Sequence, residues 1–95
     1  MEFEWDEIKR QTNLAKHGLD FIDARMIWNK PVIDPCDSRN SGTEIRYAAL
    51  GIVGRDEIIV VVVYTKRAAR IRLISARRAR RNERKAYQDR FGRGL

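Results

Sequence analysis

The sequence has few of the residues that build metal centres, disulfides and nucleophilic sites. Its 95 residues include one cysteine, Cys36, and one histidine, His17. A single cysteine excludes an internal disulfide, and no Cys-x-x-Cys or His-x-x-x-His spacing is present to bind zinc. Cys36 lies in the segment Asp34-Pro35-Cys36-Asp37, where the carboxylates disfavour a thiolate, so we interpret it as an incidental thiol. We therefore expect no metal and no cofactor.

Long apolar runs are also absent. The longest, residues 58–64, has the length of a strand and is far shorter than the roughly 18 residues that span a membrane. The opening Met1-Glu2-Phe3-Glu4 is acidic and lacks the basic start of a signal peptide. We therefore expect a cytoplasmic protein with no membrane partner. A chain of this length has room for one domain, which we assign to residues 1–95.

Positive charge is what the sequence has in excess. The formal net charge is +7, and it is unevenly placed along the chain. Residues 1–65 carry 8 basic and 11 acidic side chains, whereas residues 66–95 carry 12 basic and 2 acidic ones. This concentration predicts a polyanionic partner, with phosphate as the leading group. An acidic protein partner is the alternative.

Helix-cap residues and apolar spacing predict two helices in the first third of the chain. Asp6 is a suitable N-cap for a helix near residues 6–17, and Gly18 suits the position after its last turn. Asp20 can cap a second helix over about residues 21–28, where apolar side chains recur at helical spacing.

The middle of the chain is typical of strands. Residues 32–33 predict a short strand, and residues 34–43 have the composition of a loop. Residue polarity alternates well enough over residues 44–53 to predict a strand, and a hairpin turn is predicted at residues 54–56. Residues 58–65 are apolar on both faces, which predicts a central strand.

The last third of the chain predicts one more strand and one more helix. After a turn at residues 68–69, basic and apolar residues alternate, so that Arg70 and Arg72 point to one face. Ser75 can then cap a helix that ends near Arg90. The predicted fold class is therefore α+β, with two N-terminal helices, a three- to four-stranded antiparallel meander sheet and a C-terminal helix.

A cationic strand that leads into a cationic helix fits RNA chemically. Guanidinium groups bind two phosphate oxygens at once, and aromatic rings can stack on an unpaired base. A metal-independent ribonuclease activates a 2′-hydroxyl, stabilises a dianionic phosphorane-like state and protonates the leaving oxygen. Arginines supply the second of these functions. His17 is the predicted proton-transfer group, with the alternative that Lys16 and His17 only interact with the dipole of the first helix.

Three arginines are the strongest candidates for holding the scissile phosphate. Arg67, Arg72 and Arg77 are predicted at the end of the central strand, on its hairpin partner and at the start of the last helix. Arg46 is expected nearby, and its spacing of two from Glu44 leaves a structural ion pair open as the alternative to catalysis. A solvated helix face is the alternative interpretation of Arg78, Arg81 and Arg84. Further RNA contacts are predicted at Lys16, Tyr64, Lys66, Arg70, Arg81 and Tyr87.

Several segments of the chain, taken in order, resemble the BrnT toxin family. The similarity spans about residues 3–87 and departs at Asn40, where such sequences often carry histidine. It rests on Phe3-Glu4-Trp5-Asp6, Lys9, Asn13, Lys16-His17-Gly18, Phe21, Ala24, Ser41-x-x-Glu44-x-Arg46, Tyr64-Thr65-Lys66-Arg67, Ile71-Arg72-Leu73-Ile74-Ser75-Ala76-Arg77-Arg78-Ala79 and Glu83-Arg84-x-x-Tyr87.

The resemblance implies a RelE-like fold and ribonuclease activity. It also implies neutralisation by a cognate BrnA-type antitoxin, with the complex reaching operator DNA through the antitoxin. On this basis the predicted function is metal-independent RNA cleavage that inhibits translation and growth. The residues alone leave a second function open, which is a non-catalytic module that binds nucleic acid or an acidic partner.

Overall fold

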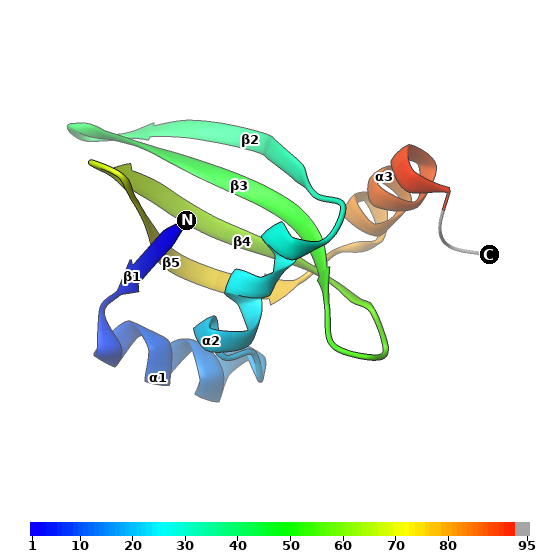
Figure 1. The fold of residues 1–95 in the computed structure, drawn as a ribbon, viewed down its shortest axis with the longest axis horizontal. Helices are drawn as coiled ribbons and strands as arrows, with labels where there is room; N and C mark the ends of the chain where they lie inside the picture. Colours follow the sequence, from blue (N-terminus) through cyan, green and yellow to red (C-terminus); the bar gives the residue numbers. More distant parts are fainter. Residues whose placement is uncertain (93–95) are drawn as a thin grey trace.

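One mixed β-sheet organises the protein in the computed structural model, which describes residues 1–92. The strand order is β1-β5-β4-β3-β2. The last four strands of the chain form an antiparallel meander, and the first runs parallel to β5 at one edge (Figure 1). The strands are β1 (Glu2–Trp5), β2 (Ile33–Ser41), β3 (Glu44–Val53), β4 (Ile58–Arg67) and β5 (Arg70–Arg78).

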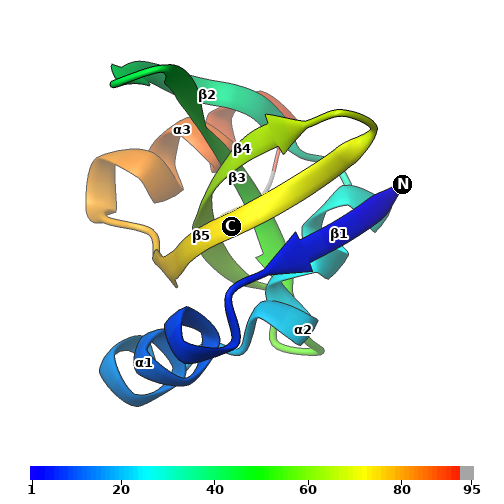
Figure 2. The same ribbon diagram turned by 90° about the vertical axis from the view of Figure 1, so that its left-hand side faces the viewer.

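Helices cover the two faces of the sheet unequally. Three of them pack on the face that we call the helical face: α1 (Glu7–His17), α2 (Phe21–Ala24) and the 3-10 helix η1 (Arg25–Asn29). The last helix, α3 (Arg81–Phe91), packs on the opposite face, and only at one end of it (Figures 1 and 2). We call this second face the open face. No helix within residues 1–92 is long and apolar enough to cross a membrane.

The predicted sheet was wrong, because the structure has five strands in a mixed sheet and not three or four antiparallel ones. β1 precedes the predicted helices, and its four residues give too short an alternation to predict a partner strand. Residues 33–41 form β2, most of which was predicted as a loop. β2 is an exposed edge strand, and its Asp, Pro, Ser and Asn residues match the composition of loops.

Two helices also differ from the prediction. The predicted second helix is a single α-turn, α2, followed by the 3-10 helix η1. The predicted cap Ser75 lies inside β5, which continues to Arg78, and α3 begins only at Arg81. Ser75 is paired with Val63 of β4, so its backbone belongs to the sheet. Arg93, one of the basic residues counted above, lies outside the described residues.

The limits of the first helix are confirmed. The carboxylate of Asp6 accepts hydrogen bonds from the backbone N–H groups of Ile8 (2.8 Å) and Lys9 (3.1 Å). Gly18 ends α1 with a φ of +69°, a left-handed conformation that favours glycine. These caps fix where the chain leaves β1 and where it turns toward α2.

Two apolar cores lie on either side of the sheet. On the helical face, Phe21 and Ile27 are fully buried against strand residues such as Val62. η1 approaches β3 closely because residue 51 is glycine, and a Cβ there would lie 2.7 Å from the Cβ of Ile27. Under α3, Tyr87 is fully buried and its hydroxyl donates to the carbonyl of Pro31 at 2.7 Å.

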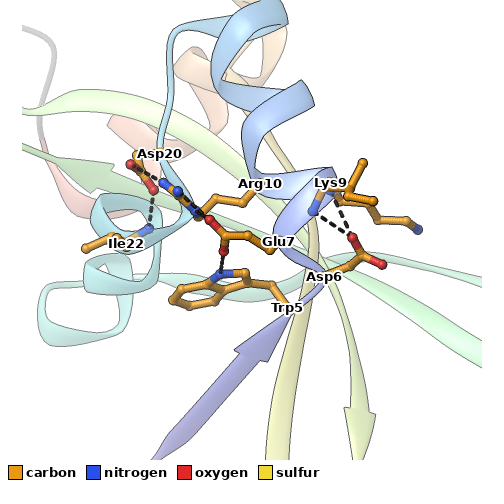
Figure 3. Close-up of polar contacts among 8 residues, drawn as sticks. Trp5, Asp6, Glu7, Lys9, Arg10, Asp20 and Ile22 are labelled. Carbon is orange, nitrogen blue, oxygen red and sulfur yellow. Dashed lines mark hydrogen bonds and ion pairs between the residues drawn. The ribbon is translucent and has the colours of Figure 1, made fainter.

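A polar cluster ties α1 to the start of α2 (Figure 3). Arg10 donates from Nε to Glu7 at 2.7 Å and from Nη1 to Asp20 at 2.9 Å. Asp20 also accepts from the backbone N–H of Ile22 at 2.9 Å, so one carboxylate both caps α2 and holds Arg10. The indole of Trp5 donates to Glu7 at 3.3 Å, which links β1 to the same cluster.

This double role predicts the cost of removing Asp20. We expect Asp20→Ala to lower the free energy of unfolding by about 1–2 kcal/mol, because α2 loses its cap and Arg10 loses a partner. Asp23→Ala, an exposed position on the same helix, is the matched control and should change it by less than about 0.5 kcal/mol. Urea unfolding of both variants makes the comparison, and equal losses would contradict the assignment.

Candidate functional site

A bulge in β5 sets the direction of the site arginines. The pairing of β4 with β5 shifts by one residue at Ile74, which has no partner on β4. Arg72 and Arg77 are five residues apart, so in a regular strand they would point to opposite faces. The extra residue brings them into phase, with Arg72 opposite Thr65 and Arg77 opposite Val61. Both arginines therefore point to the open face.

One row of side chains crosses all five strands on the open face. Arg72 is paired with Glu4 on one side and with Thr65 on the other. Arg46 is paired with Arg39, and continuing the β3–β4 register by one residue sets Arg46 opposite Thr65. Neighbouring strands are about 4.8 Å apart, so the guanidinium groups of this row share one strip of surface.

The adjacent row brings a carboxylate between two arginines. Glu44 Oε1 lies 3.7 Å from Arg46 Nε, and Glu44 Oε2 lies 3.8 Å from Arg67 Nη2. These distances are too long for good hydrogen bonds. Arg46 Nε is buried and has no hydrogen-bond partner among the described residues. Leaving a buried charged donor unpaired is costly, so this N–H favours an acceptor that arrives with a ligand.

The remaining arginines of the open face are held by carboxylates. Arg72 donates to Glu4 at 2.8 Å, and Arg70 lies 3.6 Å from Glu4 and 3.8 Å from Glu2. These two arginines hold the pKa of Glu4 below its ordinary value, mainly through the hydrogen bond from Arg72. An incoming phosphate must therefore compete with ionised carboxylates for these guanidinium groups.

A groove of about 720 Å³ lies between the β2–β3 hairpin and α3. Arg46 and Arg77 are at opposite ends of the groove. Arg77 lies in the same cross-strand row as Leu50 of β3. Leu50 is four residues along β3 from Arg46, which corresponds to about 14 Å. Arg67 and Arg72 are on the same face but do not line the groove. Its floor between the charged ends is apolar and consists of Ala48, Leu50, Val61 and Val63.

Arg77 is clamped to α3 by a two-point ion pair. Its Nη1 and Nη2 donate to the two carboxylate oxygens of Glu83 at 2.8 Å and 2.9 Å. Glu83 also accepts from the backbone N–H of Arg80 at 2.7 Å. The Arg77 guanidinium, together with this backbone bond, lowers the pKa of Glu83 to about 2. The pair fixes the start of α3 over the end of β5.

The two tyrosines predicted to contact RNA are buried. Tyr64 is 2% exposed in the helical-face core, where its hydroxyl donates to Asp34. Burial, and then that hydrogen bond, raises the pKa of Tyr64 far above its ordinary value, so its proton is held firmly. Tyr87 is fully buried under α3. In this conformation neither ring is accessible to a base.

The structure does not bring the other predicted contacts to one place. Lys16 and His17 are in the last turn of α1, which packs on the helical face, and neither lines the groove. Lys66 points to the helical face, where its Nζ lies 4.9 Å above the ring of Tyr47. Arg70 is on the open face, and Arg81 is exposed at the first position of α3.

Sequence reasoning missed the partners of these arginines. Glu4 was not predicted to face Arg72, and Glu83 was not predicted to clamp Arg77. A signal for the first pair was present, because Glu2-x-Glu4 and Arg70-x-Arg72 are complementary charge patterns with the period of a strand. The second pair depends on where α3 begins. Within residues 1–92, no three His, Cys, Asp or Glu side chains gather to hold a metal ion.

The arginines on the open face, next to the groove, give this small α+β protein a surface suited to binding phosphate. The chain matches the family model described as ribonuclease toxin, BrnT, of type II toxin-antitoxin system, over residues 5–83. Because the match covers most of the chain, the protein belongs to this family of ribonuclease toxins, and the resemblance found in the sequence is confirmed. No curated protein sequence matches the chain.

The Arg77–Glu83 pair predicts a pH-dependent stability. Because the pKa of Glu83 falls from 4.5 to about 2 on folding, its stabilisation is complete above pH 4.5 and is lost as the pH drops toward 2. We expect Glu83→Gln to lower the free energy of unfolding by about 2 kcal/mol at pH 7. The difference from wild type should shrink below pH 4.5, as measured by urea unfolding across this range.

The matched control is Asp89→Asn, which removes a carboxylate on α3 whose ion-pair partner among the described residues is the exposed Lys85. This variant should change stability by less than about 1 kcal/mol at either pH. A Glu83→Gln loss that stays constant from pH 7 to pH 2.5 would contradict the account of the pair.

Proposed function

We propose that the open face is where this ribonuclease toxin cleaves RNA, and that cleavage needs no metal ion. The observation that carries the proposal is that the buried Nε of Arg46, near Arg67 and Arg72, has no hydrogen-bond partner among the described residues. Three guanidinium groups in two adjacent rows supply donors for the charge that builds up on a phosphate during cleavage. The apolar groove floor next to them offers a surface for a sugar or a base.

The reaction that fits these groups is an internal transfer within the RNA. The 2′-oxygen attacks the adjacent phosphorus and forms a new O–P bond, while the bond from phosphorus to the 5′-oxygen of the next nucleotide breaks. The products are a 2′,3′-cyclic phosphate and a free 5′-hydroxyl. The arginine N–H groups bind the non-bridging oxygens most strongly in the transition state, when the phosphorus group carries its largest negative charge.

One proton must leave the 2′-hydroxyl, and one must reach the 5′-oxygen, which we infer takes it from water. Glu44 is the carboxylate nearest to both Arg46 and Arg67, and we assign it as the acceptor of the first proton. His17 lies on α1, on the other side of the sheet, so it would need a large rearrangement to reach the same phosphate. His17→Gln tests that role, since cleavage at the wild-type rate would remove His17 from the mechanism.

The partner of the protein follows from the same surface. A type II toxin is paired with an antitoxin, and we infer that a BrnA-type antitoxin covers the open face and blocks the arginines that hold RNA. RNA cleavage by the free toxin in the cytoplasm would inhibit translation and growth, and the complex would contact operator DNA through the antitoxin. RNA and antitoxin should then compete for free protein, and a stable ternary complex with RNA on the open face would argue against occlusion.

The experiment that tests the proposal is cleavage by arginine variants in EDTA. Arg46→Ala and Arg67→Ala are the cleanest variants, because both side chains are partly exposed, at 40% and 54%. Each should lower the cleavage rate on the order of 100-fold or more, since each removes a donor to the transition state. Arg72→Ala should lose comparable activity, and Arg77→Ala should also lower the rate, because Arg77 binds RNA at the far end of the groove. Arg81→Ala should lose less, because Arg81 is exposed on α3 and belongs to neither row of the open face.

The control is Lys9→Ala, which removes an exposed cation from α1 and should leave cleavage unchanged. Circular dichroism should show that each variant is folded. Full activity of Arg46→Ala and Arg67→Ala would place the site elsewhere. Activity that disappears in EDTA and returns with magnesium would overturn the metal-independent mechanism. RNA binding without any cleavage would favour the non-catalytic module instead.

A further inference from the structure

Asn13 is a buried polar side chain that the proposed chemistry does not use. It lies on α1 and is 6% exposed. Its Nδ2 donates to the carbonyls of Leu19 (3.0 Å) and Ala76 (2.9 Å), and its Oδ1 accepts from the N–H of Ala76 at 3.1 Å. One side chain therefore holds both backbone groups of a single residue in β5, 63 positions along the chain.

Asn13 acts where β5 has no strand beside it. β1 is paired with β5 only from Arg70 to Leu73, and the chain then turns into α1. At Ala76 the amide of Asn13 supplies one donor and one acceptor, as the peptide group of a neighbouring strand would. The hydrogen bonding of the β5 edge thus continues past the end of β1.

The residue that Asn13 holds is next to the bulge and next to Arg77. Ala76 is fully buried and paired with Val62 of the helical-face core, so Arg77, the following residue, points to the open face. A shift of one residue in strand register turns every side chain to the other face. Holding Ala76 at its N–H and C=O fixes the register after Ile74.

We propose that Asn13 is a positioning residue, which locks the β5 bulge by binding both backbone groups of Ala76 and so keeps Arg77 on the open face. The role of Arg77 in cleavage rests on the proposed function. The placement of Arg77 on the open face does not rest on it, because the ion pair with Glu83 shows where the Arg77 side chain lies. Two experiments separate these parts.

The first experiment follows Glu83 by NMR during an acid titration. Asn13→Leu keeps a side chain of similar size but has no hydrogen-bonding groups. The pKa of Glu83, which is about 2 in the wild type, should rise toward its ordinary value of 4.5 because Arg77 is no longer held beside it. Phe21→Leu, a core variant on the helical face, should destabilise the protein without moving this pKa.

A Glu83 pKa that stays at about 2 in Asn13→Leu, or that rises equally in Phe21→Leu, would overturn the proposal. Asn13→Asp provides a second variant if Asn13→Leu does not fold. It keeps the acceptor for the N–H of Ala76 and loses the two donors, so it should give a smaller shift in the same direction. The absence of any shift in the folded Asn13→Asp variant would also count against the proposal.

The second experiment is a double-mutant cycle on RNA cleavage. Asn13→Leu should lower kcat by about 10- to 100-fold with little change in KM, because it displaces Arg77, which we propose binds the RNA at the other end of the groove and positions it for reaction. Combined with Arg77→Ala, it should cause no further loss of kcat. If the double variant instead lost kcat by the product of the two single losses, Asn13 would act independently of Arg77. If Arg77→Ala alone cleaves RNA normally, the proposed function of Arg77 fails while the NMR titration still decides the placement.

Discussion

The alternation of side chains along a β-strand is the constraint on which the open face depends. Arg72 and Arg77 differ by an odd number of positions, and a regular strand would separate them. The single unpaired residue at Ile74 brings them to the same face. The groove, the clamp between Arg77 and Glu83 and the placement of α3 all follow from that shift. Bulges next to functional sites commonly re-aim a side chain in this way.

Electrostatic pairing limits how much of the charge is free to bind RNA. Arginines from the basic last third of the chain contact carboxylates from its acidic first half, as Arg72 does with Glu4 and Arg67 does with Glu44. β1 makes this pairing stronger, because its parallel register with β5 sets Glu4 opposite Arg72. The net charge of the last third therefore overstates the cationic surface. RNA binding to this face is an exchange of carboxylates for phosphates, which will be sensitive to salt.

The sequence predicted those features that local chemistry determines. Asp6 and Gly18 give the limits of α1 because a cap acts within a few residues. The apolar run of β4 identified the central strand. The arginines predicted as a group, Arg46, Arg67, Arg72 and Arg77, lie on one face of the sheet, with Arg46 and Arg77 at opposite ends of the groove. The parallel pairing of β1, the bulge and the contact between Asn13 and Ala76 were not predicted. Each depends on residues about 60 or more positions apart, or on an inserted residue without a distinctive side chain.

The most direct test of the RNA site is NMR of the arginine Nε–Hε groups during titration with an uncleavable RNA. A 2′-deoxy substitution at the cleaved position removes the nucleophile and leaves the phosphate intact. The account predicts that the Arg46 resonance shifts most, because its Nε gains a hydrogen-bond acceptor where the described residues provide none, and that Arg67 and Arg72 shift with it. Shifts confined to α1 or to the exposed face of α3, with Arg46 unchanged, would contradict it.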